Sequence, residues 1–313
     1  MPFHLVGIDE AGYGPQLGPL VVSAVVFKLP DTMLANQRHL PKIACLWKTL
    51  SNVISGNRLC DKVAVCDSKA LYQPARGIKE LEKTALVFKR LTVPAGRQVE
   101  SDYHRHNGLT LPLSADNDEI NKFAKILRAE LNENHIRFCE IKASIVEPAD
   151  FNGGIRRLRN KADFLWEISG GLIKYCVDKY SSGNTVIVRA GKQGGRNYYL
   201  PYMQRLFAGK TVRSVEQGFN DSSYIVNAKP SSDATISFIK DGDSSEFVIA
   251  LASIFSKYYR ELSMLKLNRF FQSHIPSLKP TSGYYTDSRR FIRTVNPLFD
   301  KLNLTRNDFI RIK

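Results

Sequence analysis

The longest apolar stretch in the sequence runs from Leu17 to Phe27 and is rich in β-branched valines. It is too short to cross a bilayer as a helix, which takes about 20 residues. Because β-branched residues favour the pleated, half-buried surface of a sheet, the stretch predicts a strand. A shorter apolar run, HLVGID at residues 4–9, precedes it across a segment rich in Gly and Pro. The two runs therefore predict an antiparallel hairpin, which we expect at the edge of a mixed sheet.

Strand-like and helix-like segments alternate along the rest of the chain. Residues 28–60 read as a connecting insertion with one helical stretch. Further strands are expected at 62–66, 138–148, 184–191, 223–228 and 234–243. Helices, one of them a long helix or a helix pair at 151–180, are expected at 77–91, 117–134, 151–180, 247–271 and in the tail at 277–299. This order predicts an α/β fold in which helices cover a mixed sheet.

Basic residues clearly exceed acidic ones. The 313 residues include 45 Lys and Arg against 30 Asp and Glu, a formal charge of +15 with a pI near 9.6. Such an excess favours polyanionic partners, namely nucleic acid or an anionic membrane face. A basic protein without such a partner is the alternative. The hydrophobic content of 43% indicates a folded, globular chain rather than a disordered one.

The cysteines give no sign of a metal site or a disulfide framework. They are odd in number, and no two have Cys-x-x-Cys spacing. Because the chain begins without a signal-peptide pattern, we interpret them as reduced thiols of a cytoplasmic protein. We expect a monomer that needs neither a membrane nor a protein partner. The residues are Cys45, Cys60, Cys66, Cys139 and Cys176.

Asp9 and Glu10 are adjacent acids that follow the first apolar run and precede Ala-Gly-Tyr-Gly-Pro. Carboxylates placed close together bind Mg²⁺ or Mn²⁺, and two such ions can activate water and stabilise the leaving oxygen around a phosphate. Neighbours on one strand point to opposite faces, so both acids would enter one pocket only if the chain turned between them. The glycines could supply that turn. A solvated acidic turn is the alternative interpretation.

Four segments in order carry a resemblance to a known family. They are GIDEAGYGPQLGPLVVSAVVF at 7–27, the stretch 65–71 with Asp67-Ser68-Lys69, ALASIFSKYYREL at 250–262, and SGYYTDSRRF at 282–291. Together they resemble the motifs of ribonuclease HII, the type 2 branch of the ribonuclease H-like fold. The resemblance implies a mixed five-stranded sheet flanked by helices. It further implies a catalytic domain at 1–265, with 28–60 as an insertion, and a helical subdomain at 266–313 packed on the core.

The resemblance also implies site residues. Asp9, Glu10 and Glu261 would be the catalytic, metal-binding acids, with Glu261 standing where the family has Asp. The residues that would contact nucleic acid are Gly12, Tyr13 and Gly14, which approach the substrate backbone, Lys257, which meets phosphate, and Tyr284, which packs on the sugar. Tyr13 occupies a position at which the family has Arg.

The KQGGR stretch adds two candidates from its own residues. Two glycines allow close backbone approach, and Lys192 and Arg196 flank them, a pattern compatible with a phosphate cradle. An ordinary glycine turn is the alternative.

The sequence departs from the family at the end of the strand at 184–191. Arg189, Ala190 and Gly191 stand where the family has a metal-binding Asp, and an arginine cannot ligate Mg²⁺. Three alternatives follow. Another acid could enter the site, with Asp67, Asp243 and Glu216 as candidates; three acids could suffice at a reduced rate; or the chain could bind nucleic acid without cutting it.

What the resemblance implies is a metal-dependent endonuclease that uses Mg²⁺ or Mn²⁺. Its substrate would be the RNA strand of an RNA–DNA hybrid, or a ribonucleotide embedded in duplex DNA, cut to leave 5′-phosphate and 3′-hydroxyl ends. The alternative is a catalytically impaired protein on the same scaffold that binds nucleic acid without cleaving it.

Overall fold

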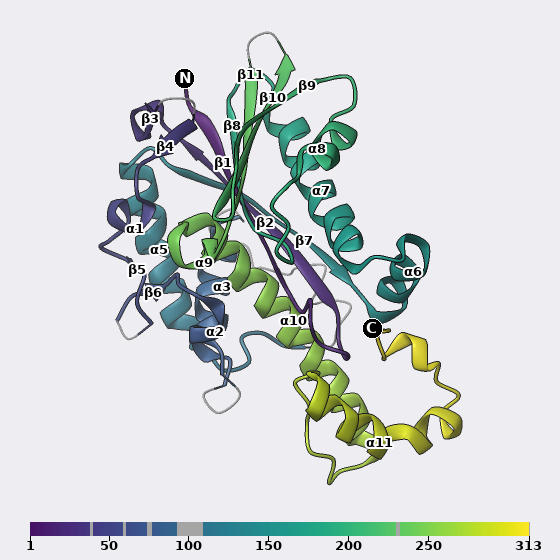
Figure 1. Ribbon diagram of the computed structural model, residues 1–313. Helices are drawn as coiled ribbons and strands as arrows, with labels where there is room; N and C mark the ends of the chain where they lie inside the picture. The colour runs from purple at the N-terminus through teal and green to yellow at the C-terminus, as the bar shows by residue number, and fades with distance from the viewer. Residues whose placement is uncertain (38–39, 59–60, 74–76, 93–108, 230–231, 313) are drawn as a thin grey trace.

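A seven-stranded mixed sheet forms the centre of the computed structural model (Figure 1), which describes residues 1–37, 40–58, 61–73, 77–92, 109–229 and 232–312. The strand order is β7-β2-β1-β8-β11-β10-β9. The strands are β1 (Phe3–Ala11), β2 (Leu20–Leu29), β7 (Arg137–Val146), β8 (Val186–Gly191), β9 (Thr211–Gln217), β10 (Asp221–Lys229) and β11 (Ser232–Ile239).

The pairing confirms a mixed sheet and corrects the expected place of the first hairpin. Strands β1 and β2 are antiparallel as predicted, but they lie in the interior, because β7 pairs with β2 and β8 with β1. Strands β1, β8 and β11 are mutually parallel neighbours. The sheet extends beyond the expected five strands, because β10 and β9 add antiparallel ribbons after β11. Of these two, β9 had no strand predicted for it.

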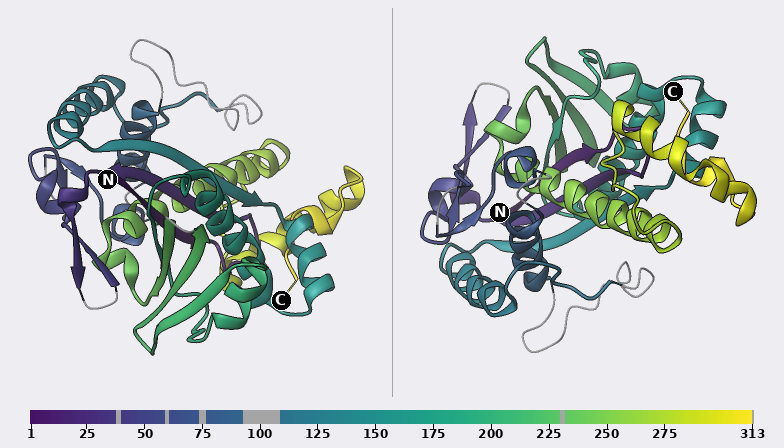
Figure 2. Two further views of the ribbon diagram at one scale, coloured as in Figure 1. Left: turned by 90° about the horizontal axis from the view of Figure 1, so that it is seen from above. Right: turned by 90° about the horizontal axis from the view of Figure 1, so that it is seen from below.

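Helices cover both faces of the sheet, as the views along the sheet in Figure 2 show. One face packs against α10, α3 and α5 through a core that includes Phe27, Phe88 and Phe247. The other face packs against α6, α7 and α8 through Trp166, Tyr199 and Phe238. These helices are α3 (Lys79–Leu91), α5 (Asn117–Glu133), α6 (Pro148–Leu158), α7 (Lys161–Tyr180), α8 (Leu200–Leu206) and α10 (Phe247–His274). The predicted α/β fold with flanking helices is confirmed.

The insertion predicted at 28–60 folds as small elements beside the sheet rather than as part of it. It holds a short 3₁₀ helix η1 (Asp31–Met33), a hairpin of β3 (Leu34–Gln37) and β4 (Leu40–Ile43), α1 (Leu46–Thr49), and β5 (Ile54–Ser55). Strand β5 pairs in parallel with β6 (Val63–Ala64), which is all that forms of the strand expected at 62–66. Residues 38–39 and 59–60 of the insertion lie outside the described residues.

The C-terminal region is helical and ends back against the first domain. Helix α11 (Tyr285–Lys301) and the short 3₁₀ helix η2 (Arg306–Asp308) follow α10, which runs unbroken across the expected domain boundary at 265 and 266. A separate apolar cluster forms here around Phe271, Phe291 and Phe299. Figure 1 shows the chain returning from α11 toward α6, where Asn152 binds the carbonyl of Ile310 at 2.8 Å.

Two further observations bear on the sequence predictions. No helix among the described residues is long and apolar enough to cross a membrane. The thiols of Cys45, Cys66, Cys139 and Cys176 are free, whereas Cys60 lies outside the described residues.

Candidate functional site

A cavity of about 330 Å³ lies at the carboxyl ends of β1, β8 and β11. In open α/β sheets ligands bind at this edge, because the loops leaving parallel strands converge there. Ten residues were predicted for the site. Eight of them line the cavity, namely Asp9, Glu10, Gly12, Tyr13, Gly14, Lys192, Lys257 and Tyr284. The two others, Glu261 and Arg196, do not.

Asp9 faces α10. Its carboxylate is hydrogen-bonded to Ser253 of α10, and the hydroxyl of Ser253 in turn lies 3.1 Å from that of Ser68 at the start of α2 (Ser68–Leu71). Burial raises the pKa of Asp9 to about 7; the Ser253 hydrogen bond opposes this shift, and the charge of Asp243 adds to it. Ser256 of α10 also binds the carbonyl oxygen of Asp9 at 2.8 Å. Helix α10 therefore holds both the backbone and the side chain of this acid.

Glu10 leaves the opposite face of the same strand. No turn separates it from Asp9, because β1 continues to Ala11. Both acids nevertheless line the cavity, which extends around the end of the strand. Burial raises the pKa of Glu10 well above its usual value, and the charge of Asp9 raises it further. Two adjacent carboxylates are thus held where their charged forms are disfavoured unless a cation is near.

A third acid, Asp243, lines the cavity from α9 (Gly242–Ser245), directly after β11. Burial and the charge of Asp67 raise its pKa. Lys69, which is exposed and lines the same cavity, opposes the pKa increase at Asp9, Glu10 and Asp243. Of the three acids named as replacements for the missing Asp, Asp243 is the one at the cavity. Asp67 caps α2 through the amide of Lys69 at 2.9 Å, and Glu216 lies exposed on the edge strand β9.

Glu261 is bound by cations of its own helix. Its carboxylate accepts from Lys257 at 2.8 Å and from Arg260 at 2.9 Å, and its side chain is 6% exposed. Tyr72 also hydrogen-bonds to it, which together with burial raises the pKa of that phenol. Lys257 and Arg260 both line the cavity. Glu261 thus stands behind the cavity wall and positions two cations within it.

The end of β8 leaves no room for a side chain beside Asp9. A Cβ atom at Gly191 would lie 2.5 Å from Oδ1 of Asp9. Ala190 is buried in the core on the opposite face of the sheet. Arg189 donates to Ser237 and to the carbonyl oxygen of Pro41, both at 2.8 Å, and so ties the β3–β4 hairpin to the sheet. The three residues therefore contribute packing and space rather than a charged ligand.

The two cations predicted for a phosphate cradle are engaged within the protein. Lys192 lines the cavity, but its ammonium donates to the side chain of Asn197 at 3.0 Å and to the carbonyl oxygens of Gly218 and Phe219. Arg196 forms an ion pair with Asp163 at 2.8 Å and lies over the ring of Tyr202. These contacts fix the turn after β8 against neighbouring elements.

The segment from Gly12 to Gly14 forms one rim of the cavity. Gly12 has a φ of +86°, and a Cβ atom there would lie 2.5 Å from the carbonyl oxygen of Pro19, so the turn requires glycine. The guanidinium of Arg311, almost fully buried, donates to the carbonyl oxygens of Gly12 and Tyr13. The ammonium of Lys161 lies 4.6 Å from the centre of the Tyr13 ring. The last residues of the chain thus hold this rim.

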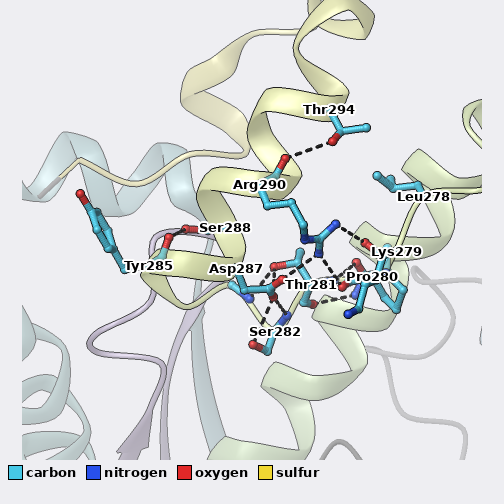
Figure 3. A network of polar contacts seen from close by, with 12 residues as sticks. Leu278, Lys279, Pro280, Thr281, Ser282, Tyr285, Asp287, Ser288, Arg290 and Thr294 are labelled. Atoms are coloured by element: carbon cyan, nitrogen blue, oxygen red, sulfur yellow. Dashed lines mark hydrogen bonds and ion pairs between the residues drawn. The ribbon is translucent and has the colours of Figure 1, made fainter.

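Tyr284 reaches the cavity from the loop before α11 and is 52% exposed. A polar network holds this loop (Figure 3). Asp287 accepts from the hydroxyl of Thr281 at 2.6 Å and from the amide of Ser282 at 2.8 Å, and it pairs with Arg290 at 2.7 Å. On the other side, Arg260 donates to the carbonyl oxygen of Ser282 at 2.8 Å. The loop is therefore fixed from α11 and from α10.

The donors at the cavity fit a hard divalent cation. Mg²⁺ is usually bound by one or two carboxylates and completes its shell with waters and substrate phosphates, and Mn²⁺ accepts the same oxygen ligands. Asp9 and Glu10 supply such a pair. In the part of the chain that the structure describes, no group of three His, Cys, Asp or Glu side chains is close enough to hold a metal ion by itself. The residues therefore fit an ion that also needs water or substrate as ligands.

Sequence reasoning did not assign three residues that line the cavity. Lys69 lay in the Asp-Ser-Lys motif but was given no role, and Arg260 was passed over beside Glu261. Asp241, which has a φ of +50° before α9, also lines it. An available signal was the Asp-Gly-Asp at the end of a predicted strand, since the carboxyl ends of parallel strands meet at one edge.

Comparisons with known proteins give the following similarities. No protein-family model matches the sequence, and no curated protein matches it. Three solved structures are similar. They are ribonuclease HII of Archaeoglobus fulgidus in its complex with PCNA (15% identity, TM-score 0.42, 99% of this chain and 95% of that one), ribonuclease H2 of Pyrococcus horikoshii (13%, 0.45, 98% and 92%) and Bst ribonuclease HIII with Mn²⁺ (11%, 0.42, 99% and 66%). The chain is thus similar, at low sequence identity, to ribonucleases HII and HIII, the group that its sequence motifs resemble.

Proposed function

We propose that the protein is a metal-dependent endonuclease of the ribonuclease H type. The observation that carries the proposal is the convergence of Asp9, Glu10 and Asp243 with Lys69 and Lys257 around one cavity. Acids that hold a divalent cation next to lysines that bind phosphate are the components that phosphodiester hydrolysis needs. We propose as substrate the RNA strand of an RNA–DNA hybrid or a ribonucleotide within duplex DNA.

Each group at the cavity has a proposed task. Asp9 and Glu10 would hold Mg²⁺ or Mn²⁺, with Asp243 as the third acid. The ion, when bound, supplies charge stabilisation to the phosphate and lowers the pKa of a bound water. Lys69 and Lys257 would bind phosphate oxygens, and Arg260 would keep Lys257 and Glu261 in register.

The other side of the cavity would contact the sugar. The Gly12–Gly14 rim exposes backbone, since nothing lies within 4 Å of a Cβ atom placed at Gly14. Tyr284, half-exposed opposite this rim, would pack on the ribose or base. Aromatic packing tolerates every base, because each base has a flat face. The site would therefore recognise sugar and backbone rather than base sequence.

A second candidate function is nucleic-acid binding without cleavage. The pairing of Glu261 with Lys257 and Arg260 favours it, because this pairing removes one expected acid from the metal ligands. Binding would then weaken steeply with salt and persist in an Asp9→Ala variant.

The test is cleavage of a DNA duplex that carries one ribonucleotide, with Mg²⁺ and Mn²⁺ compared and a fully deoxyribonucleotide duplex as substrate control. We expect the wild-type protein to cut beside the ribonucleotide and Asp9→Ala to bind the duplex without cutting it. If the wild-type protein cuts with neither metal yet binds the duplex, the binding function replaces the nuclease proposal.

A further inference from the structure

A second cavity, of about 520 Å³, adjoins the candidate site and is built largely by the insertion. Asp243 lines both cavities. Helix α2 separates them, since Asp67 lines the second cavity, whereas Ser68 and Lys69 line the first. The volume lies in the range of roughly 300–1,000 Å³ that is typical of ligand-binding pockets. The second cavity is therefore a neighbour of the reacting centre, large enough for one unit of a polymeric substrate.

Trp47 gives this cavity a fixed aromatic wall. Its indole nitrogen donates to the carbonyl oxygen of Val65 at 2.7 Å, and its ring packs edge-on against Phe247 with ring centroids 5.5 Å apart. Gly56 lies beside the ring, close enough that a Cβ atom there would be 3.5 Å from it. A ring held in this way loses little conformational entropy on contact with a ligand.

Arg58 supplies the one cation among the described residues that line the second cavity. Within the described part of the chain its guanidinium has no hydrogen bond or ion pair. The carboxylates of Asp67 and Asp243 belong to the same lining, and Asp67 already accepts from the amide of Lys69. Because these acids repel an anion, a phosphate in this cavity is expected at Arg58. The guanidinium can bind two phosphate oxygens at once.

We propose that the second cavity binds the nucleotide next to the reacting phosphate on the same strand, with Arg58 on its phosphate and the Trp47 wall against its sugar or base. The inference rests on the proposed function, because a strand whose phosphate lies in the first cavity extends from it past Asp243. The insertion then contributes a binding subsite, so its contacts set how many nucleotides beside the cut the protein requires.

The experiment measures the binding of a DNA duplex with one ribonucleotide to Asp9→Asn protein, which binds without cutting. Arg58→Ala is added to this background, and Lys48→Ala, which removes an exposed charge from the same insertion, is the matched control. Duplexes shortened on one or the other side of the ribonucleotide are compared with the full duplex. Thermal unfolding of each variant checks that the fold is kept.

We expect Arg58→Ala to weaken binding of the full duplex about 10-fold and to reduce the slope of log K against log salt by about 0.9, the value for one phosphate contact. Shortening the strand on one side should cost the parent protein a similar factor and leave the Arg58→Ala protein unchanged. Equal affinities and slopes for Arg58→Ala and Lys48→Ala would overturn the inference, as would an Arg58→Ala loss that is the same on every shortened duplex.

The two proposals fail in different ways. A wild-type protein that neither cuts nor binds the duplex would overturn the proposed function and this inference with it. A wild-type protein that cuts, together with an Arg58→Ala variant equal to its control, would overturn the inference alone.

Discussion

The ammonium of Lys257 lies 2.8 Å from the carboxylate of Glu261, one helical turn away on α10. Lys257 lines the cavity, whereas Glu261 stands behind it. The acid that the motif assigns to metal binding therefore serves as the partner of two cations, Lys257 and Arg260. A site assembled in this way depends on α10 for its positive charges and on β1 for its negative ones.

Glu261 and Asp243 are expected to respond differently to mutation. Removing one partner of a buried ion pair leaves an uncompensated charge, so Glu261→Ala should lower the free energy of unfolding by about 3–5 kcal/mol. Asp243 is only partly buried, and Asp243→Asn should leave stability nearly unchanged. Loss of outer-shell groups costs a metal enzyme 10–100-fold, so loss of a proposed ligand should lower cleavage at least about 100-fold. Urea denaturation and cleavage assays on both variants test this. Full activity of Asp243→Asn would contradict the assignment.

Returning an acid to the end of β8 is expected to harm the site. Gly191 faces Asp9 so closely that a side chain there would displace the Asp9 carboxylate. Gly191→Asp should therefore reduce cleavage, and Gly191→Ala should do so too, because the collision needs only a Cβ atom. Cleavage rates of both variants, with Gly195→Ala as a control in the same turn, give the answer. A faster Gly191→Asp enzyme would show that the missing acid can be restored in place.

Tyr284 is expected to contribute through its ring rather than its hydroxyl. Stacking on a nucleotide is worth about 1–3 kcal/mol, so Tyr284→Ala should weaken duplex binding by roughly 5–150-fold. Tyr284→Phe should keep most of the affinity. Titration of a labelled duplex measures both. Equal losses in the two variants would point to the hydroxyl as the important group.

The Asp287 network predicts an indirect effect on the same residue. Asp287→Asn would weaken the contacts that hold Thr281 and Ser282, and with them the loop that carries Tyr284. Duplex affinity should fall, and the loss should disappear when Tyr284 is already Ala. A double-mutant cycle on binding measures this coupling. Additive losses would mean that Asp287 acts independently of Tyr284.

Glu140 is expected to make stability depend on pH. Burial alone would raise its pKa, but hydrogen bonds from Tyr180, Lys179 and Tyr175 of α7 and its C-cap region outweigh burial and lower it. An acid with a lowered pKa stabilises the fold above its ordinary pKa, which is near 4.5, and this stability is lost as the pH falls through the folded-state value. Glu140→Gln should therefore destabilise the protein at neutral pH and less so in acid. Urea denaturation at both pH values checks the sign, which a pH-independent loss would contradict.

The sequence by itself determined the layers of the fold. Runs of β-branched residues predicted β1, β2, β7 and β8, and helical spacing predicted α3, α5 and α10, because local periodicity decides which face of an element is buried. It could not show that the first hairpin lies inside the sheet, nor that β9 and β10 extend it. Strand neighbours depend on contacts between distant segments, and those contacts leave no local pattern.

The tertiary structure decided the membership of the site. Motifs brought Asp9, Glu10, Lys257 and Tyr284 to the right edge of the sheet, because their places at element ends follow from the local sequence. Which acid joins them depended on how α9 and α10 pack at that edge. That packing brings Asp243 to the cavity and turns Glu261 toward Lys257 and Arg260. A charged side chain is directed by its nearest partners in space, and only the folded chain brings those partners together.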